Sequence, residues 1–409
     1  MSMRLGCVPT IVVSSPRAAE IFLKTHDTVF ASRPTVQVAE YLPYGAKGMV
    51  FTQYGPYWRN VRKFCTLELL SATKIDSFAA MRREELESLV RSLKETVVAH
   101  EVVDVTEKVA VVIENMTYRM LFGRSKDDRF DLKANVVEAI RLAGAFNLAD
   151  FVPLLGALDL QGMTRGLKAI SKALDKILET IIDEHVQEAK SGHKKYANDF
   201  VDVMLSLMNK STNTHDQLSY VIDPIKIKAI ILDMISGGID TSATAIDWTL
   251  TELIRHPKVM KQLQEELQSV MGVDGMLDES NLAKLEYLNM VIKESFRLHP
   301  VAPLLAPHES MEDIVIDGYY IPKKSRIIVN SWAIGRDPNV WSDNAEEFIP
   351  ERFIGSNRDL RGHNFELTPF GSGRRGCPGM HLGLVNIRSV VARFVHGFDW
   401  ELPNGIATF

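Results

Sequence analysis

One of the three cysteines of the chain, Cys377, lies in the glycine-rich stretch 370–379, and its neighbours suit a metal ligand. Glycines at 371, 373, 376 and 379 can take positive φ angles and let the backbone approach a bulky partner closely. Arg374 and Arg375 precede the sulfur, and cationic neighbours favour the thiolate. Backbone N–H groups of such a turn can also point at the sulfur. An inert, buried cysteine is the alternative interpretation.

A second group of reactive side chains lies in the stretch 236–242, Ser-Gly-Gly-Ile-Asp-Thr-Ser. Two glycines are costly inside a helix, and here an acid, Asp240, and a hydroxyl, Thr241, follow them in an apolar background. A positioned acid and hydroxyl can deliver protons to a reacting group. The alternative is a glycine-weakened kink in which Thr241 bonds back to a helix carbonyl.

A third pattern is Glu294 and Arg297, which are three residues apart and therefore share one face of a helix. Alone, such a pair is usually a weak surface ion pair. The same chain also contains Pro350-Glu351-Arg352-Phe353, 25 residues before Cys377.

The elements that must position these residues are mostly helical. Pro378 suits the first turn of a helix that follows the cysteine, and the stretch 224–255 predicts one long, buried helix of about 32 residues. The other predicted helices are 16–25, a helix from Trp58, 74–99, 106–122, 132–148, 164–190, 257–271 and 282–299. Hairpins are expected at 4–15 and 313–330, and 28–56 is expected to be a long irregular segment.

Composition excludes several classes of protein. The chain has 409 residues and a net charge of −5, which gives no reason to expect a nucleic-acid partner. Three cysteines are too few for a disulfide framework, so a reducing compartment is expected. No run approaches the roughly 20 apolar residues of a membrane span.

Together these motifs resemble the cytochrome P450 family. Five positions match its haem-ligand loop F-x-x-G-x-R-x-C-x-G: Phe370, Gly373, Arg375, Cys377 and Gly379. The stretch 236–242 matches the motif of its oxygen-binding helix. Ala31–Pro34 and Tyr54–Arg59 are similar to the plant microsomal members. The resemblance implies a mainly α fold, a helical bundle with a small β-rich lobe near the N-terminus, and a single catalytic domain over residues 1–409.

The resemblance also implies roles for single residues. Cys377 would be the axial thiolate of the haem iron, a ligand that favours O–O cleavage, while Asp240 and Thr241 would handle protons. Glu294, Arg297 and Arg352 would form a buried charge network under the haem. Contacts to the haem, including its propionates, would come from Trp58, Arg62, His308, Phe370, Gly373, Arg375 and Gly379.

The activity implied is monooxygenation of a lipophilic small molecule such as a terpenoid or phenolic. Electrons would come from NADPH through a reductase docked near Arg59, Lys63 and Arg374. The enzyme would be a monomer at the cytosolic face of the endoplasmic reticulum, and its loop 149–157 would touch the membrane. Substrate contacts would come from segments 34–52 and 143–153 and from Met234, Gly237, Val301, Leu304 and Leu305. Their apolar character favours a lipophilic ligand.

Plant members of the family also carry an N-terminal membrane helix and a C-terminal β-hairpin, and this sequence is expected to be shorter at both ends. Two other functions therefore stay open. One is a haem-thiolate isomerase or dehydratase that needs neither oxygen nor a reductase. The other is a truncated protein that binds haem without turnover.

Overall fold

The computed structural model describes residues 1–42, 44–125, 129, 131–191, 199–208, 222–272 and 279–403. Within them the chain is mainly helical with a small group of strands, as predicted. The helices are α1 Pro16–Glu20, α2 Gln37–Tyr41, α3 Pro56–Phe64, α4 Ala72–Asp76, α5 Ala79–Ala99, α6 Val105–Phe122, α7 Leu132–Gly144, α8 Met163–Ser191, α9 Phe200–Leu207, α10 Pro224–Gly238, α11 Asp240–Arg255, α12 Pro257–Met271, α13 Glu286–Leu298, α14 Ser331–Ile334, α15 Pro338–Trp341 and α16 Met380–Gly397. The strands are β1 Ser2–Leu5, β2 Val8–Val13, β3 His308–Glu309, β4 Ile314–Ile316, β5 Tyr319–Ile321 and β6 Arg326–Val329.

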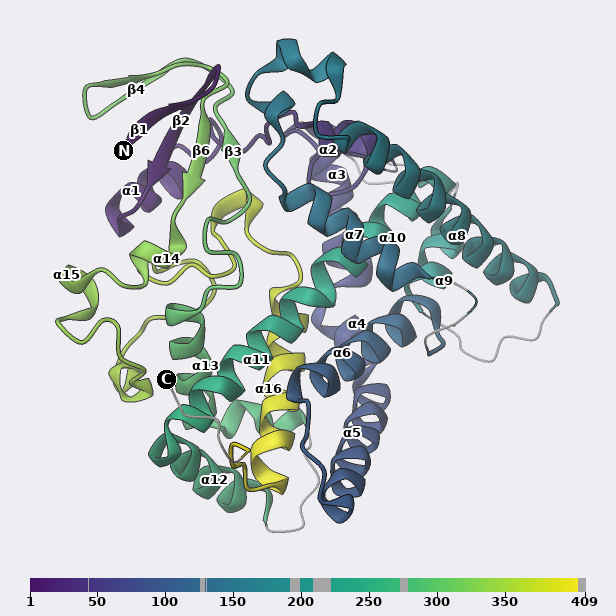
Figure 1. Cartoon of the computed structure of the whole chain (residues 1–409), viewed down its shortest axis with the longest axis vertical. Helices are drawn as coiled ribbons and strands as arrows, with labels where there is room; N and C mark the ends of the chain where they lie inside the picture. Colours follow the sequence, from purple (N-terminus) through teal and green to yellow (C-terminus); the bar gives the residue numbers. More distant parts are fainter. Residues whose placement is uncertain are drawn as a thin grey trace.

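The strands gather at one corner of the molecule, beside the N-terminus (Figure 1). The predicted hairpin at 4–15 is confirmed as the antiparallel pair β1–β2. The predicted hairpin at 313–330 is only half right. Its first part is the pair β4–β5, turned by positive φ angles at Asp317 and Gly318, but β6 joins a four-stranded sheet of order β1-β2-β6-β3. Most of β6 is buried, which suits a central strand flanked on both sides.

Most predicted helices are present, with differences at their ends. The helix predicted at 257–271 has the bounds of α12, and 106–122 and 164–190 correspond to α6 and α8. The helix predicted at 74–99 is instead α4 and α5, separated at Phe78, whose φ of −96° and ψ of 6° are not helical. Helix α9 lies in no predicted element, and the segment 28–56 contains the short α2.

The long helix predicted at 224–255 is divided into α10 and α11 at Ile239, where ψ is −69°. Taken together, this stretch is the one part of the described chain long and apolar enough to cross a membrane. It nevertheless packs inside the fold, because α11 contacts α6, α13 and α16. Figure 1 shows α11 and α16 side by side in the middle of the larger, helical part.

Candidate active site

The cysteine loop is closed by backbone hydrogen bonds. The amide of Cys377 donates to the carbonyl of Phe370 at 2.8 Å. Gly371 and Gly373 have φ of 68° and 66°, but Gly376 and Gly379 do not have positive φ, contrary to the prediction. Helix α16 begins at Met380, so Pro378 precedes its first turn rather than lying in it.

Opposing influences act on the sulfur of Cys377. Desolvation is the largest influence and leaves the pKa of the thiol raised, while N–H groups of Gly379 and Met380 and the charge of Arg62 act to lower this pKa. The expectation of backbone donors at the sulfur is therefore confirmed. The predicted cations are different: Arg62 of α3, not Arg374 or Arg375, acts on the sulfur.

Gly373 is required by both conformation and space. A methyl group there would overlap the carbonyl oxygen of Leu23 and lie 2.9 Å from Oδ1 of Asp27. We expect Gly373→Ala to lose at least about 1–2 kcal/mol from the positive φ alone and to bind less haem, because the loop must move. Thermal unfolding and haem content measure both effects. Gly397→Ala, which has open space around the new methyl group, is the control and should behave as wild type.

Arg375 is buried, and three backbone carbonyls hold its guanidinium. Nε donates to the carbonyl of Ala31 at 2.6 Å, and Nη2 donates to that of Thr52 at 2.6 Å. Nη1 donates to the carbonyl of Met49 at 3.2 Å, and the guanidinium lies 4.1 Å from the ring centroid of Trp58.

Two more arginines belong to the same group. Arg62 donates from Nη2 to the carbonyl of Gly376 at 2.6 Å, so it joins α3 to the cysteine loop. Arg33, which the sequence analysis did not assign to the site, donates to three carbonyls, those of Val50, Ala306 and Pro307, at 3.3, 2.6 and 2.8 Å.

These three guanidinium charges have no compensating carboxylate among the described residues. Burial lowers the pKa of Arg33 to about 10, with repulsion from Arg62 as a further cause. Burial likewise lowers the pKa of Arg375 to about 9, and Arg33 and Arg62 add to this effect. All three stay charged at neutral pH. Concentrated positive charge beside a cysteine sulfur suits a ligand with two carboxylates and a metal, and haem has both.

Trp58 and His308 lie beside these arginines, but their N–H groups donate to backbone carbonyls of the protein. The indole N–H of Trp58 donates to the carbonyl of Met49 at 3.1 Å. Nδ1 of His308 lies 2.8 Å from the carbonyl of Phe30, which can only accept, so Nδ1 carries the proton. Burial, together with the charge of Arg33, lowers the pKa of His308 to about 3, so the ring is neutral. A donor role for His308 toward a propionate is therefore disfavoured, and Arg33 is the better candidate.

The stretch 236–242 lies where α10 meets α11. The hydroxyl of Thr241 donates to the carbonyl of Gly237 at 2.6 Å, the back-bonding that the alternative interpretation expects. Asp240 is exposed and is the first residue of α11. A side chain at Gly237 would meet nothing within 4 Å, so space is open at this point of the helix.

The residues predicted to contact substrate are spread over two elements. Met234 is partly buried on α10, while Leu304 is exposed on the segment after α13. Leu305 has a φ of 49° and lies beside the cysteine loop, with Cδ1 3.8 Å from the position of a methyl group on Gly371. Val301 is partly buried and packs against the core cluster that contains Phe296.

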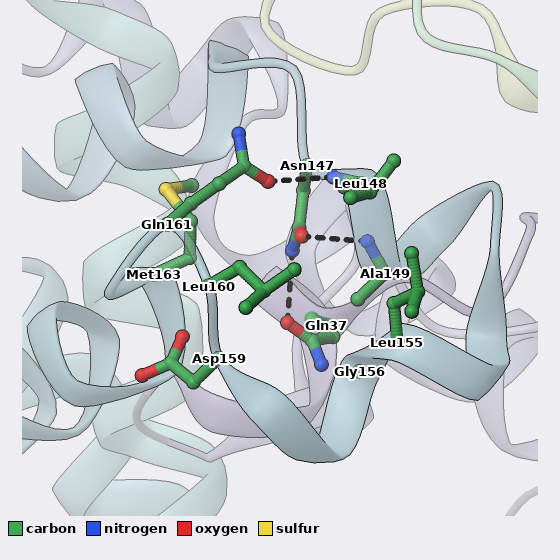
Figure 2. Close-up of a pocket in the computed structure, with 10 residues that line it drawn as sticks. All are labelled: Gln37, Asn147, Leu148, Ala149, Leu155, Gly156, Asp159, Leu160, Gln161 and Met163. Carbon is green, nitrogen blue, oxygen red and sulfur yellow. Dashed lines mark hydrogen bonds between the residues drawn. The ribbon is translucent and has the colours of Figure 1, made fainter.

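The predicted substrate segments 34–52 and 143–153 pack against each other. Figure 2 shows a small cavity that is lined by Gln37 and residues of 147–163, where the amide of Asn147 donates to Oε1 of Gln37 at 2.9 Å. The carboxylate of Asp150 also accepts from the backbone of Gln37 at 2.7 Å. The cavity measures about 10 Å³, which is room for about one water molecule, so it is not a substrate pocket.

Glu294, Arg297 and Arg352 lie in one hydrogen-bonded network. Glu294 accepts from Nε of Arg297 and from Nε of Arg352, both at 2.7 Å. Arg297 also donates to the carbonyls of Gly335, Ala345 and Glu347. Glu294 and Arg297 are almost fully buried. The network therefore joins α13 to the segment 335–352.

The three cations expected at a reductase-docking face are not equivalent. Arg59 and Lys63 are exposed on α3 and are four residues apart. Arg374 instead forms an ion pair with Asp27 at 2.6 Å.

A separate cluster of potential metal ligands joins α8 to α9. His185, Asp199 and Asp202 are buried, with ligand atoms within 4.8 Å of one another. Nδ1 of His185 lies 2.8 Å from the carbonyl of Ile181, and Nε2 lies 3.4 Å from Asp199. Burial is the largest single influence and lowers the pKa of His185, but the hydrogen bonds to Asp199 and the Ile181 carbonyl and the charges of Asp199 and Asp202 together outweigh it, so the pKa is raised. With Lys74 nearby, the positive and negative charges balance, so the cluster is complete as an ion-pair group.

This cluster gives a prediction about pH. Because the folded-state pKa of His185 is raised, protonated His185 stabilises the fold fully below about pH 6.5, and this contribution is lost as pH rises through the folded-state value. The difference in unfolding free energy between wild type and His185→Gln should therefore shrink as pH rises. Urea unfolding of both proteins, at pH values below and above about 6.5, measures this difference in unfolding free energy. His363→Gln, at an exposed ring, should follow wild type, and a constant difference for His185→Gln would contradict the prediction.

Comparison with known proteins agrees with this geometry. The family model "Cytochrome P450" matches residues 1–407. Cytochrome P450 CYP736A12 of Panax ginseng is 66% identical over 405 residues, 99% of this chain and 81% of the relative. Desmethyl-deoxy-podophyllotoxin synthase of Sinopodophyllum hexandrum is 41% identical, over 99% of this chain and 79% of the relative. A zebra fish cytochrome P450 solved with progesterone superposes with a TM-score of 0.78 at 26% identity, over 97% of this chain and 88% of that structure.

The chain therefore belongs to the cytochrome P450 family, and its named plant relatives include members of groups 71 and 84. The protein is a cytochrome P450 monooxygenase with a haem-iron cofactor, and NADPH supplies electrons through a redox partner, as is standard in this family.

Proposed function

We propose that this enzyme inserts one oxygen atom of O2 into a lipophilic small molecule of plant specialised metabolism, such as a terpenoid or phenolic. The single observation that carries the proposal is the uncompensated group of Arg33, Arg62 and Arg375 next to Cys377. This group provides both a sulfur ligand and positive charge for two carboxylates. The named plant relatives support specialised metabolism as the setting.

When bound, haem supplies an iron that activates dioxygen. The residues of this chain do the rest. Cys377 would hold the iron, and N–H groups of Gly379 and Met380 act to lower the pKa of its thiol and so assist formation of the thiolate. Arg33, Arg62 and Arg375 would hold the propionates, with Phe370, Gly373 and Gly379 shaping the loop. Glu294, Arg297 and Arg352 fix the fold beneath it.

At the junction of α10 and α11, Asp240 and Thr241 would hold and move protons. The Thr241 hydroxyl has one donor, which in this structure goes to the carbonyl of Gly237, and its oxygen remains free to accept. Asp240 is exposed and can exchange protons with solvent. Met234, Gly237, Val301, Leu304 and Leu305 form the proposed apolar lining that orients the substrate and excludes water.

We place the redox partner, NADPH-cytochrome P450 reductase, on the exposed face of α3. Arg59 and Lys63 present two positive charges there, which suit an acidic partner. The proposed setting is a monomer on the cytosolic face of the endoplasmic reticulum, where the loop 149–157, with its exposed Leu154, contacts the membrane.

The test is a reconstituted assay of the haem-loaded protein with a plant reductase, NADPH and a panel of apolar plant compounds. Compounds that change the spin state of the haem are taken forward. Product formation that needs both oxygen and NADPH supports the proposal. Product formed without either indicates an isomerase or dehydratase, and a normal carbon-monoxide spectrum without any turnover indicates an inactive haem protein.

A further inference from the structure

The loop Ala46–Thr52 connects two parts of the active site that are far apart in the sequence. On one side its carbonyl groups hold the cationic and indole groups: Met49 accepts from Trp58 and Arg375, and Thr52 accepts from Arg375. Val50 adds a carbonyl for Arg33 at 3.3 Å. The position of these side chains therefore depends on the position of this loop.

On the other side the loop is held by a single carboxylate. Asp233, on α10, accepts hydrogen bonds from the backbone amides of Met49 and Val50. A methyl group at Gly48 would overlap this carboxylate. The hydroxyl of Thr52 closes the loop by donating to the carbonyls of Ala46, at 2.7 Å, and Gly48.

The N–H of Val50 and the C=O of Met49 belong to one peptide group. In a trans peptide these two bonds point in opposite directions, so this group accepts from Arg375 and Trp58 on one side and donates to Asp233 on the other. Hydrogen bonds in such a chain polarise and strengthen one another. The negative charge of Asp233 therefore makes the Met49 carbonyl a better acceptor for the Arg375 guanidinium.

We infer that Asp233 is a positioning residue for the haem, which acts through the Met49–Val50 peptide group on Arg375 and Trp58. The inference rests on the proposed role of Arg375 as a propionate contact. It also links the helix that leads to Asp240 and Thr241 with the groups that hold the cofactor. A shift of α10 on one side would be transmitted to the propionates on the other.

The experiment compares Asp233→Asn with wild type as haem-loaded proteins. Asparagine keeps the shape but removes the charge and one strong acceptor, so haem transfer to excess apomyoglobin should become roughly tenfold faster. The matched control is Asp150→Asn, whose carboxylate also accepts a backbone amide of this N-terminal segment, that of Gln37, but holds no carbonyl of the arginine group. Its haem loss should stay within about twofold of wild type.

The pH profile separates positioning from general loosening. Burial raises the pKa of Asp233 to about 6, and burial keeps the facing Cys65 a neutral thiol. As pH falls through about 6, wild-type Asp233 becomes protonated and loses its charge, as the Asn variant already has. The haem-loss rate of Asp233→Asn divided by that of wild type should therefore fall toward one. A ratio that is independent of pH would contradict the inference.

Other outcomes keep the two proposals distinguishable. Wild type and both variants should keep the reduced, carbon-monoxide band near ~450 nm, because Cys377 is unchanged. If wild type lacks this band, the proposed function fails and the inference fails with it. If the band is present and Asp233→Asn loses haem no faster than Asp150→Asn, only the inference is overturned. Should Asp233→Asn not fold, Gly48→Ala, which displaces the carboxylate from the amides, must show the same faster loss.

Discussion

Replacing Cys377 by serine is expected to abolish the reduced, carbon-monoxide band near ~450 nm and all oxygen-dependent turnover. The structure gives the physical reason. Two backbone N–H groups and Arg62 partly offset the desolvation that raises the pKa of the Cys377 thiol, so they lower the cost of forming its thiolate. A serine hydroxyl is a far weaker acid than a thiol, so the same contacts cannot make it an anionic ligand for the iron. The measurement is the difference spectrum of the purified, haem-loaded variant.

Cys7→Ser is the matched control, because Cys7 is an exposed cysteine far along the chain from the loop. It should have the spectrum of wild type. If Cys377→Ser bound haem and retained the band, assignment of the iron ligand to Cys377 would be wrong, and with it the proposed roles of the surrounding residues.

Glu294→Gln is expected to have the largest effect on stability. The change leaves Arg297, about 1% exposed, without a carboxylate, and an uncompensated buried charge of this kind costs on the order of 3–5 kcal/mol. We therefore expect a large drop in the urea midpoint of unfolding, and little soluble haem-loaded protein. Denaturant unfolding and haem content per mole of protein measure the two effects.

The chain offers a control with the same spacing. Glu138 and Arg141 are also three residues apart and share two hydrogen bonds, at 2.5 Å each, but both are exposed. Since water solvates such a pair when it is broken, Glu138→Gln should change the midpoint little. Equal effects of the two substitutions would show that burial of Glu294 contributes nothing.

The sequence was informative where the chemistry depends on local spacing. The cysteine loop and the pair Glu294 and Arg297 could be recognised because their partners lie within a few residues. The fold class was implied by the resemblance of these motifs to the cytochrome P450 family, and the family model confirms it. The two glycines at 237–238 suggested weakness in a long helix, but the division at Ile239 was not predicted, because the helical pattern continues across it.

What the sequence analysis missed depends on contacts between distant residues. Arg33 lies in the stretch Ala31–Pro34, which resembles the plant members, yet only the fold brings its side chain to the carbonyls of Ala306 and Pro307. The cationic neighbour of the sulfur was sought at 374 and 375, whereas Arg62 comes from another helix. Asp233 was included only in the helix stretch 233–237 that was expected to contact substrate, since nothing in its spacing indicates the loop that it holds.

The parallel pairing of β2 with β6 has a consequence for synthesis of the protein. Val13 pairs with Val329, so the sheet cannot be completed until residue 329 has been synthesised and has left the ribosome. At about 5–20 residues per second, the β1–β2 hairpin waits on the order of 15–60 seconds with one edge open. Such long-range pairing folds slowly, and chaperones that shield this edge during translation should raise the yield of haem-loaded enzyme.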